Sequence, residues 1–429
     1  MTAPVGLLFA SLPCLITAAG LYFLIRLRGF FVLHPLRSAR YLLRGKRLRS
    51  SLSALALALS GTLGVGSISG VALALAVGGP GAILWMWVSA LFSMAVHYAE
   101  VVLALDGSLR MGRLHGVLLL LLAPTLGGCL QSAAAAEAAS IALGTPRTAV
   151  GLLLALGVGA VVLLGSGGIA RATGRILPIL SLLYLILTLG VILKNAEALP
   201  GVLSLVAREG LSPSAASGGL LGCAWVGFSR GLLSNEAGAG TAVCAHAEAK
   251  EADPCRQGLL GVLEVGIDTL LFCTLSALAL LTSGYGQTGD LSPLLSGCAE
   301  VFGRAAPPLL ALVLLVFAYA SALAFLHHGL AVVGEGSPLR RESYTLGFLL
   351  ATALGASLPS EATASLVDLL LLAMTALTLF ATVKAADRVV SLSAAAGLIR
   401  FGRKRGSAIA GSRPRQRSAR VSQAPRARS

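Results

Sequence analysis

The sequence RGLLSNEAGAGTA, residues 230–242, interrupts a long apolar stretch with polar residues and glycine. Arg230, Asn235 and Glu236 are costly to bury in a lipid bilayer, and glycine weakens a helix at the same place. A second interruption, SGTLGVGSISG, covers residues 60–70. Backbone that leaves the helical conformation at membrane depth is tolerated only where it lines a cavity or holds a ligand. The two stretches therefore predict two broken membrane helices that line a binding site.

Glycine alone does not require this interpretation, because it is frequent in membrane helices and permits close packing. In both breaks, however, glycine coincides with Ser, Thr, Asn or Glu at corresponding positions of the two halves of the chain. This coincidence favours a functional role over packing alone.

The composition around these breaks is that of a polytopic membrane protein. The 429 residues are 56% hydrophobic and only 12% charged, and the mean hydropathy is +0.85. The formal net charge of +15 is concentrated beside apolar runs, as membrane topology requires, so nucleic-acid binding is not expected. Seven cysteines are scattered without a C-x-x-C pair, so neither disulfides nor a metal site is expected.

Apolar runs of about 20 residues predict eleven membrane-spanning helices. They cover residues 4–26, 52–78, 81–105, 114–143, 148–165, 176–193, 217–247, 258–283, 306–333, 343–358 and 364–383. Lys and Arg gather in alternate loops, which places the N-terminus outside and the C-terminal tail in the cytoplasm. The expected location is the plasma membrane, with the lipid bilayer as a partner.

When the first of the eleven spans is set aside, the two breaks fall in the first and the sixth of the remaining ten. This spacing predicts a five-plus-five inverted repeat. In such an arrangement half-helix N-termini attract a carboxylate, and freed carbonyls coordinate a cation. We therefore expect five segments. They are an N-terminal helix with a basic cytoplasmic loop (1–51), a first repeat broken at 60–70 (52–193), an external loop (194–216), a second repeat broken at 234–240 (217–383), and a basic, disordered cytoplasmic tail (384–429).

Three long stretches, at residues 61–91, 228–250 and 253–281, resemble the alanine or glycine:cation symporter family, the sodium:alanine symporters of the amino acid, polyamine and organocation superfamily. The resemblance implies an all-α integral membrane protein with a leucine-transporter-type fold and one extra N-terminal helix. It also implies symport of a small neutral amino acid, alanine or glycine, with a sodium ion, by alternating access.

The resemblance further implies the residues of the site. Sodium would be bound by Ser60, Leu63, Phe317 and Ser321. The substrate would be bound at the first break by Thr62, Gly64, Val65, Gly66 and Ser67, on the third core helix by Glu137, and at the second break by Ser234, Asn235, Glu236, Ala237, Gly238 and Gly240.

The chain departs from the family pattern at several of these positions. Ser67 and Ala139 replace asparagines, Glu137 replaces a glutamine, and Ala320 lacks the hydroxyl that pairs with Ser321 in the family. Fewer oxygen ligands weaken a site for a hard cation. Proton coupling, to which the Glu137 carboxylate would contribute, is therefore an alternative to sodium coupling. A non-transporting amino-acid sensor of the same fold is a further alternative.

Charged residues inside the spans raise separate questions. Arg230 requires a carboxylate or several carbonyls as a partner. Glu236 either contacts the substrate or stabilises the break, by capping the half-helix or by pairing with Arg230. Asp268 is expected to bind neighbouring backbone or to lie in the ion path. His97 and Glu100 are expected to pair or to reach the membrane interface at the inner end of their span.

Other classes of function fit less well. No motif of a hydrolase, metalloprotease or P-loop enzyme stands in a suitable context, so an enzyme is not expected. Adjacent His327 and His328 point about 100 degrees apart on a helix, which disfavours a metal site. Two half-helix breaks suit alternating access better than an open channel. No cofactor beyond the coupling ion is expected. The sequence does not determine the oligomeric state and is compatible with a monomer.

Overall fold

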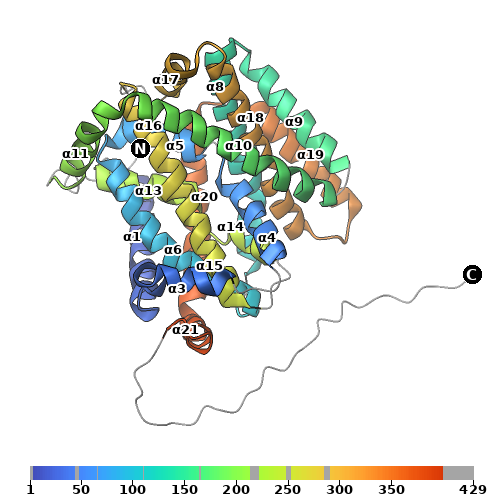
Figure 1. Cartoon of the computed structure of the whole chain (residues 1–429). Coiled ribbons are helices and arrows are strands. Elements are labelled where there is room, and N and C mark those ends of the chain that lie inside the picture. Colours follow the sequence, from blue (N-terminus) through green and yellow to red (C-terminus); the bar gives the residue numbers. More distant parts are fainter. Residues whose placement is uncertain are drawn as a thin grey trace, which may run out of the picture.

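The structure, a computed structural model, describes residues 3–43, 48–64, 66–109, 111–163, 166–212, 222–247, 253–284 and 290–399. The regular elements of these residues are all helical, and no strand occurs among them. Figure 1 shows the helices gathered into one bundle, with α6 and α15 running through its middle. The all-α prediction is confirmed for the described part of the chain.

The helices of the first half cover most of the first six predicted spans. They are α1 (Ala3–Arg26), α4 (Leu48–Thr62), α5 (Gly66–Gly78), α6 (Ala82–Asp106), α7 (Arg113–Leu122), the π-helix η1 (Ala123–Leu130), α8 (Gln131–Leu143), α9 (Arg147–Leu163) and α10 (Ser166–Lys194). Those of the second half are α13 (Cys223–Asn235), α14 (Thr241–Ala247), α15 (Pro254–Val265), the π-helix η4 (Gly266–Cys273), α16 (Thr274–Thr282), α18 (Ala306–Val333), α19 (Pro338–Gly355) and α20 (Ser360–Lys384).

Short helices occupy segments between or after the predicted spans. They are α2 (Phe30–Leu33), α3 (Pro35–Leu43), the 3-10 helix η2 (Ala196–Ala198), α11 (Leu199–Gly210), α17 (Ser292–Phe302) and α21 (Ala386–Ala395). The segment predicted as an external loop is thus largely helical, and the tail predicted to be disordered begins with a helix. Residues 400–429 of that tail lie outside the described residues.

Among the described helices, five are long and apolar enough to cross a membrane, counting the continuous runs through η1 and η4 as one helix each. A sixth crossing results if the pair that bends by 73° after α10 counts as one span. The count of eleven crossings therefore stays a prediction, as do the repeat boundaries.

Close contacts between small residues explain how the central helices pack. A Cβ added to Gly227 of α13 would lie 2.2 Å from the Ala82 carbonyl oxygen, and one added to Gly231 would lie 2.2 Å from Ser89 Oγ of α6. On the other side of α6, a Cβ on Gly258 of α15 would lie 2.6 Å from Val102. Glycine lets these backbones approach closely, as is common between membrane helices. As a result, α6 is held tightly between α13 and α15.

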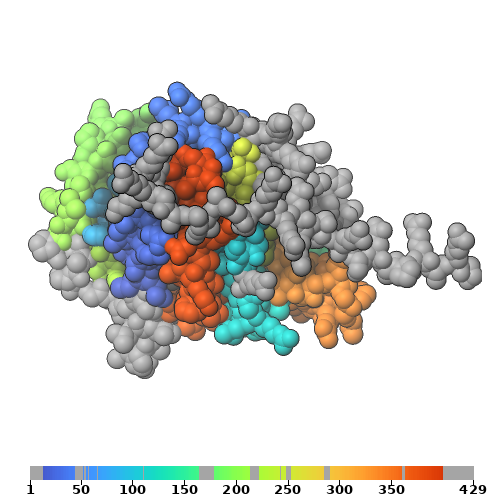
Figure 2. Space-filling model, turned by 90° about the horizontal axis from the view of Figure 1, so that it is seen from below, coloured from blue at the N-terminus to red at the C-terminus, as the bar shows by residue number. Residues whose placement is uncertain are grey.

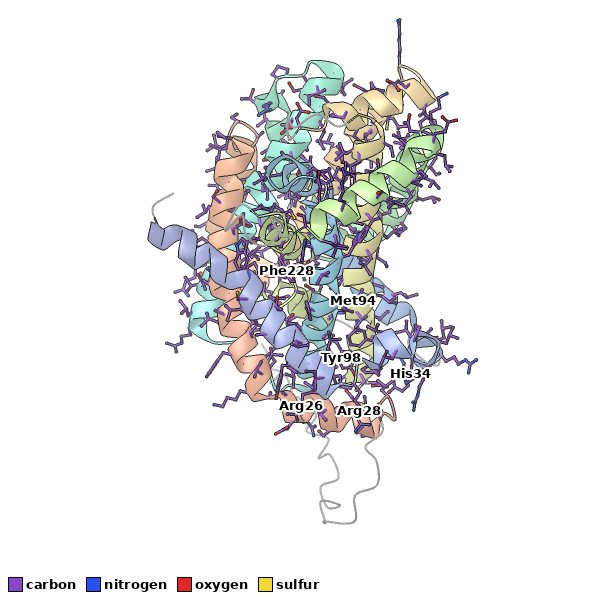
Figure 3. All side chains as sticks on the ribbon, turned by 90° about the vertical axis from the view of Figure 1, so that its left-hand side faces the viewer. Arg26, Arg28, His34, Met94, Tyr98 and Phe228 are labelled. Carbon is purple, nitrogen blue, oxygen red and sulfur yellow. The ribbon has the colours of Figure 1, made fainter. Side chains whose placement is uncertain are left out.

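At the lower end of the bundle, the C-terminal end of α1 lies beside α21, near the end of the described chain. Arg26 at the end of α1 pairs with Asp387 of α21, and Figure 3 shows Arg26 beside that helix. Arg388 donates two hydrogen bonds, of 2.8 and 2.7 Å, to the Asp106 carboxylate at the end of α6. Figure 2 shows red residues from the end of the described chain beside blue residues from its beginning on this lower face. The helix α21 is therefore anchored by charge pairs to α1 and α6.

Candidate functional site

The first break separates α4 from α5. The last turn of α4 ends with the Gly64 amide donating to the Thr62 carbonyl oxygen at 2.7 Å, and α5 begins at Gly66. Val65, one of the predicted substrate residues, lies outside the described residues. Ser67 follows in the first turn of α5 and is 1% exposed. The interruption is shorter than the predicted range of 60–70, because α4 continues to Thr62 and α5 begins at Gly66.

The second break separates α13 from α14. Glu236 caps α13 in the left-handed conformation with φ of 51°, which is unusual for a residue with a side chain. Gly238 and Gly240 follow with φ of 87° and 80°, and α14 begins at Thr241. The Asn235 side chain accepts a hydrogen bond of 3.1 Å from the backbone amide of Ala237. Asn235 thus stabilises the unwound segment.

The two breaks meet at one carboxylate, that of Asp268 in η4. Ser67 donates to Asp268 Oδ1 at 2.5 Å, and Ser234 donates to Oδ2 at 2.6 Å. Thr269 Oγ1 lies 3.0 Å from the same Oδ2 and also accepts a 3.1 Å hydrogen bond from Asn235. All five side chains are buried. Asp268 binds side chains from both breaks, whereas the sequence suggested neighbouring backbone or the ion path.

The predicted cation ligands are brought together in part. Ser321 Oγ in α18 lies 2.9 Å from the Ser60 carbonyl oxygen and 3.2 Å from that of Gly61. Leu63 and Phe317 are buried in one hydrophobic cluster. A hydroxyl set against the last carbonyls of a half-helix is the kind of oxygen cluster that a small hard cation uses.

Gln131 is a polar residue at the first break that sequence reasoning missed. A Cβ on Gly64 would lie 2.6 Å from Gln131 Oε1 and 2.6 Å from Ser321 Oγ, so both side chains contact the backbone of the break. Gln131 is 3% exposed and begins α8. The QSAAAA sequence, a lone amide ahead of four alanines, is the signal that could have identified it. Glu137, six residues further along α8, is half-buried and stays a prediction.

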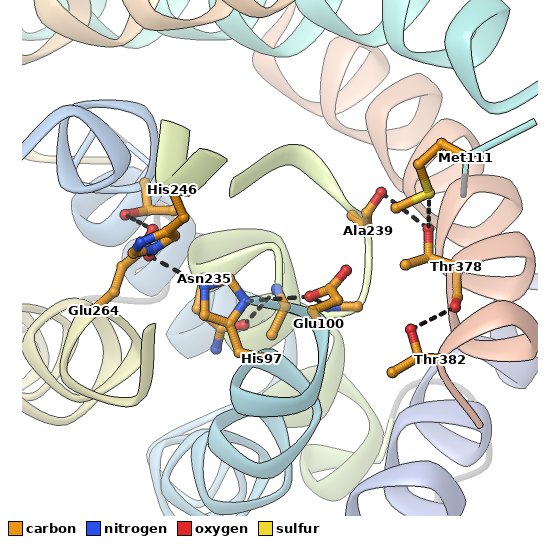
Figure 4. A network of polar contacts seen from close by, with 12 residues as sticks. His97, Glu100, Met111, Asn235, Ala239, His246, Glu264, Thr378 and Thr382 are labelled. Carbon is orange, nitrogen blue, oxygen red and sulfur yellow. Dashed lines mark hydrogen bonds and ion pairs between the residues drawn. The ribbon is translucent and has the colours of Figure 1, made fainter. Parts of the chain in front are cut away.

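A cluster of ionisable residues lies beside the breaks, and we call it the His–Glu cluster. It consists of His97, Glu100, His246 and Glu264 (Figure 4), and Gln257 binds His246 at its edge. Glu264 Oε2 lies 3.1 Å from His97 Nε2 and 2.9 Å from His246 Nε2. All members are at most 1% exposed. The expectation that His97 and Glu100 reach the membrane interface is therefore wrong, although pairing was correctly expected.

The cluster touches both breaks. Thr62 Oγ1 lies 3.5 Å from Glu264 Oε1 at the first break. At the second break the Gly238 amide donates to Glu100 Oε2 at 2.9 Å. The Ala239 carbonyl oxygen lies 2.8 Å from His115 Nε2 and 3.4 Å from Thr378 Oγ1 (Figure 4 shows Thr378). The unwound backbone of the second break is thus held by side chains from three other helices.

Arg230 has the carboxylate partner that its burial requires. Its guanidinium lies 2.5 Å from Asp368 Oδ2 of α20, and both side chains are at most 15% exposed. This pairing with Asp368 replaces the suggested pairing of Arg230 with Glu236. Glu236 itself is 5% exposed at the cap of α13.

Comparison with known proteins identifies the family of the chain. Residues 5–106 and 107–395 match the sodium:alanine symporter family. The chain is 32% identical over 355 residues to the sodium/alanine symporter AgcS of Methanococcus maripaludis, covering 73% of this chain and 78% of that protein. It is 32% identical over 350 residues to the probable sodium/glutamine symporter GlnT of Bacillus subtilis, covering 75% and 73%.

A third relative carries the proton as well as sodium in its name. The putative sodium/proton-dependent alanine carrier protein YrbD of Bacillus subtilis is 36% identical over 263 residues, covering 56% of this chain and 54% of that protein. The family match spans nearly the whole described chain, and the apolar helices fit a multi-pass membrane protein. The chain therefore belongs to the sodium:alanine symporter family.

Proposed function

We propose that the protein is a secondary active symporter that moves alanine or glycine with sodium. The observation that carries the proposal is the meeting of the two breaks at Asp268, through Ser67 and Ser234. Two half-helices with freed backbone groups on either side of a buried carboxylate suit a zwitterionic amino acid and a small cation. Membership in the sodium:alanine symporter family supports the same class of cargo.

The helix packing supports a five-plus-five inverted repeat, because two contacts between the halves have counterparts when the halves are exchanged. The helix α6 of the first half packs on α13 of the second, and correspondingly α15 of the second half packs on α4 of the first. Likewise α10 packs on α18, and α20 packs on α7 and η1. Exchanging the halves converts each contact into its partner, as an inverted repeat requires. The proposed topology has eleven crossings, an external N-terminus and a cytoplasmic tail in the plasma membrane.

The small residues at the breaks support a small substrate. Ala237, Gly238 and Gly240 offer no long side chain, and the predicted substrate residue Gly66 has no atom within 4 Å of an added Cβ. This open space beside the first break suits the methyl group of alanine. We propose that Thr62, Gly64, Val65, Gly66, Ser67 and Glu137, together with residues 234–238 and Gly240, bind the substrate, and that Ser60, Leu63, Phe317 and Ser321 bind sodium.

The test is uptake of labelled alanine and glycine into proteoliposomes with an inward sodium gradient. Concentrative uptake that depends on sodium, and that stops when an ionophore collapses the gradient, is the expected result. Parallel liposomes with the same sodium on both sides serve as the control. Failure of every small neutral amino acid to accumulate under both sodium and proton gradients would overturn the proposal. Binding of alanine without any uptake would indicate the sensor instead.

Proton coupling is the second candidate, and two observations favour it. Ala320 lacks a hydroxyl beside Ser321, so the sodium site has one oxygen fewer than the family pattern. The relative YrbD is named as a sodium/proton-dependent carrier. An inward proton gradient without sodium distinguishes the two: sodium coupling predicts background uptake under this condition, and proton coupling predicts accumulation.

A further inference from the structure

We propose that His97, His246 and Glu264 form a binding site for a divalent transition-metal ion of the zinc type. The three residues come from α6, α14 and α15, and their ligand atoms all lie within 4.8 Å of one another. Each is at most 1% exposed. Two imidazole nitrogens and one carboxylate oxygen are a common three-residue ligand set for zinc. This site is separate from the sodium site at Ser60 and Ser321.

The distances suit a metal with little rearrangement. Glu264 Oε2 lies 2.9 Å from His246 Nε2 and 3.1 Å from His97 Nε2. Zinc binds nitrogen and oxygen at about 2.0–2.2 Å, so tetrahedral ligands lie about 3.3–3.6 Å apart. The two imidazole nitrogens therefore need to move away from Glu264 Oε2 by only a few tenths of an ångström to admit the ion, and all three ligand atoms already lie within 4.8 Å of one another.

The atoms behind the two imidazoles support the same conclusion. His246 Nδ1 lies 2.7 Å from Gln257 Nε2, and His97 Nδ1 lies 3.3 Å from Glu100 Oε2. Among the described residues, His97 Nδ1, Glu100 Oε1 and Gln257 Oε1 are buried without a hydrogen-bond partner. Metal-bound histidines usually donate their other N–H to a carboxylate or an oxygen acceptor, which fixes the tautomer.

Metal binding would assign the protons of both imidazoles. If both Nε2 atoms bind the ion, both Nδ1 atoms carry a proton. The Nδ1–H of His97 then donates to the Glu100 carboxylate. The Nδ1–H of His246 donates to Gln257 Oε1 after the side-chain amide of Gln257 rotates by about 180°, which exchanges its oxygen and nitrogen. Without a metal, neutral His246 accepts from Gln257 Nε2 and donates to Glu264, whereas His97 must carry protons on both ring nitrogens to donate to Glu264 and Glu100 together.

The charge of the cluster also matches a divalent ion. Glu264 and Glu100 together carry two negative charges when ionised, and two neutral histidines add none. A bound divalent cation brings the sum to zero, which matters because an unbalanced charge at membrane depth is costly. The ion would join α14, which starts directly after the second break, to α6 and α15.

The experiment is titration of the purified, chelator-treated protein in detergent with Co²⁺ and then Zn²⁺. We expect about one Co²⁺ per chain and visible d–d bands typical of four-coordinate sites, without the thiolate charge-transfer band that the seven cysteines would produce. Zn²⁺ should displace Co²⁺. X-ray absorption of the zinc form should give only nitrogen and oxygen ligands, at about 2.0–2.2 Å.

Variants identify the ligands. His97→Gln, His246→Gln and Glu264→Gln should each abolish stoichiometric binding, and Gln257→Ala should weaken it about 10- to 100-fold, because Gln257 only orients His246. His327→Ala, which removes a histidine of α18 outside the cluster, should bind like the unaltered protein. Size exclusion and thermal unfolding verify that each variant is folded, and Gln257→Ala provides a ligand-preserving test if the ligand variants do not fold.

Two outcomes would overturn the site. One is the absence of saturable Co²⁺ or Zn²⁺ binding by the folded protein, which would leave the cluster as a hydrogen-bonded network that exchanges only protons. The other is binding that His246→Gln and Glu264→Gln leave unchanged. Neither outcome depends on amino-acid uptake, so failure of the metal site and failure of the proposed symport are distinguishable.

Discussion

The hydroxyl oxygens of Ser67 and Ser234 lie 3.2 Å apart, although 167 residues separate the two serines in the sequence. One follows the first break and the other precedes the second, and both donate to the carboxylate of Asp268. A movement that separates the half-helices must therefore break or exchange at least one of these hydrogen bonds. Asp268 is in a position to couple the conformations of the two breaks.

Asp268→Asn should lower uptake by about tenfold or more without loss of folded protein. The amide keeps the size of the side chain but cannot accept from both serines as a carboxylate does, and hydrogen bonds to charged groups contribute about 1.5–3 kcal/mol each. Since about 1.4 kcal/mol corresponds to a factor of ten, losing one such bond is sufficient. The measurement is the initial rate of alanine uptake in proteoliposomes, normalised to the amount of folded protein.

The matched control for this substitution is Glu197→Gln, which neutralises an exposed carboxylate in η2. It should transport at the unaltered rate. Equal rates for Asp268→Asn and Glu197→Gln would show that the carboxylate between the breaks is dispensable.

Gly64→Ala should impair the protein, whereas Gly70→Ala should not. A Cβ on Gly64 would lie 2.6 Å from both Gln131 Oε1 and Ser321 Oγ, so the first break or its neighbours must shift. A Cβ on Gly70 meets no atom within 4 Å. We expect Gly64→Ala to lose most sodium-driven uptake and Gly70→Ala to keep it, measured as above. If both variants retain the same sodium-driven uptake, the close approach of Gln131 and Ser321 to Gly64 is not required for transport.

Substitutions in α18 should change the sodium dependence in opposite directions. Ser321→Ala removes the hydroxyl that lies 2.9 Å from the Ser60 carbonyl oxygen, and Ala320→Ser adds one at the neighbouring buried position. At about 1 kcal/mol per polar contact, each should shift the sodium concentration for half-maximal uptake about fivefold, upward for Ser321→Ala and downward for Ala320→Ser.

Ala318→Ser is the control for the added hydroxyl. It adds a hydroxyl to the same helix, α18, at a position about 200 degrees around the helix axis from position 320. Sodium dependence should stay unchanged in this variant. A fall in sodium requirement in both serine variants would trace the effect to general polarity of α18 and not to a ligand position.

The helical framework could be predicted from the sequence because its signals are local. Apolar runs give the long helices, and glycine beside Ser, Asn and Glu gives the two interruptions. The helix α11 also has a local signal that the loop prediction overlooked: Pro200 near its start and apolar residues at helical spacing. The start of the tail was misjudged because α21 depends on distant anchors, Asp106 and Arg26.

The contacts of the site could not be predicted, because they join residues that are far apart in the chain. His97 and Glu264 are separated by 167 residues, and only the crossing of α6 with α15 brings them together. The sequence indicated that Arg230 needs a carboxylate, but it could not identify Asp368 among the acidic residues. The amide of Gln131 stands out in the QSAAAA sequence, but its role depends on the approach of α8 to Gly64 at the first break, which the sequence does not show.

For the ion pair between Arg230 and Asp368, we expect the double variant to be more stable than either single variant. Removing one partner leaves an uncompensated charge in a largely buried position, which costs about 3–5 kcal/mol. Arg230→Met and Asp368→Leu should therefore each lower the thermal unfolding temperature in detergent. Their combination should recover most of the loss, since well-packed apolar residues replace a buried ion pair at little cost.

The exposed pair between Arg26 and Asp387 is the matched control for this prediction. The Asp387 side chain is 93% exposed, and exposed ion pairs contribute about 0–1 kcal/mol, so Asp387→Asn should leave the unfolding temperature nearly unchanged. Additive losses in the double variant would mean that Arg230 and Asp368 stabilise the bundle through separate partners. Recovered stability together with lost uptake would instead show that the charges, and not only the packing, serve transport.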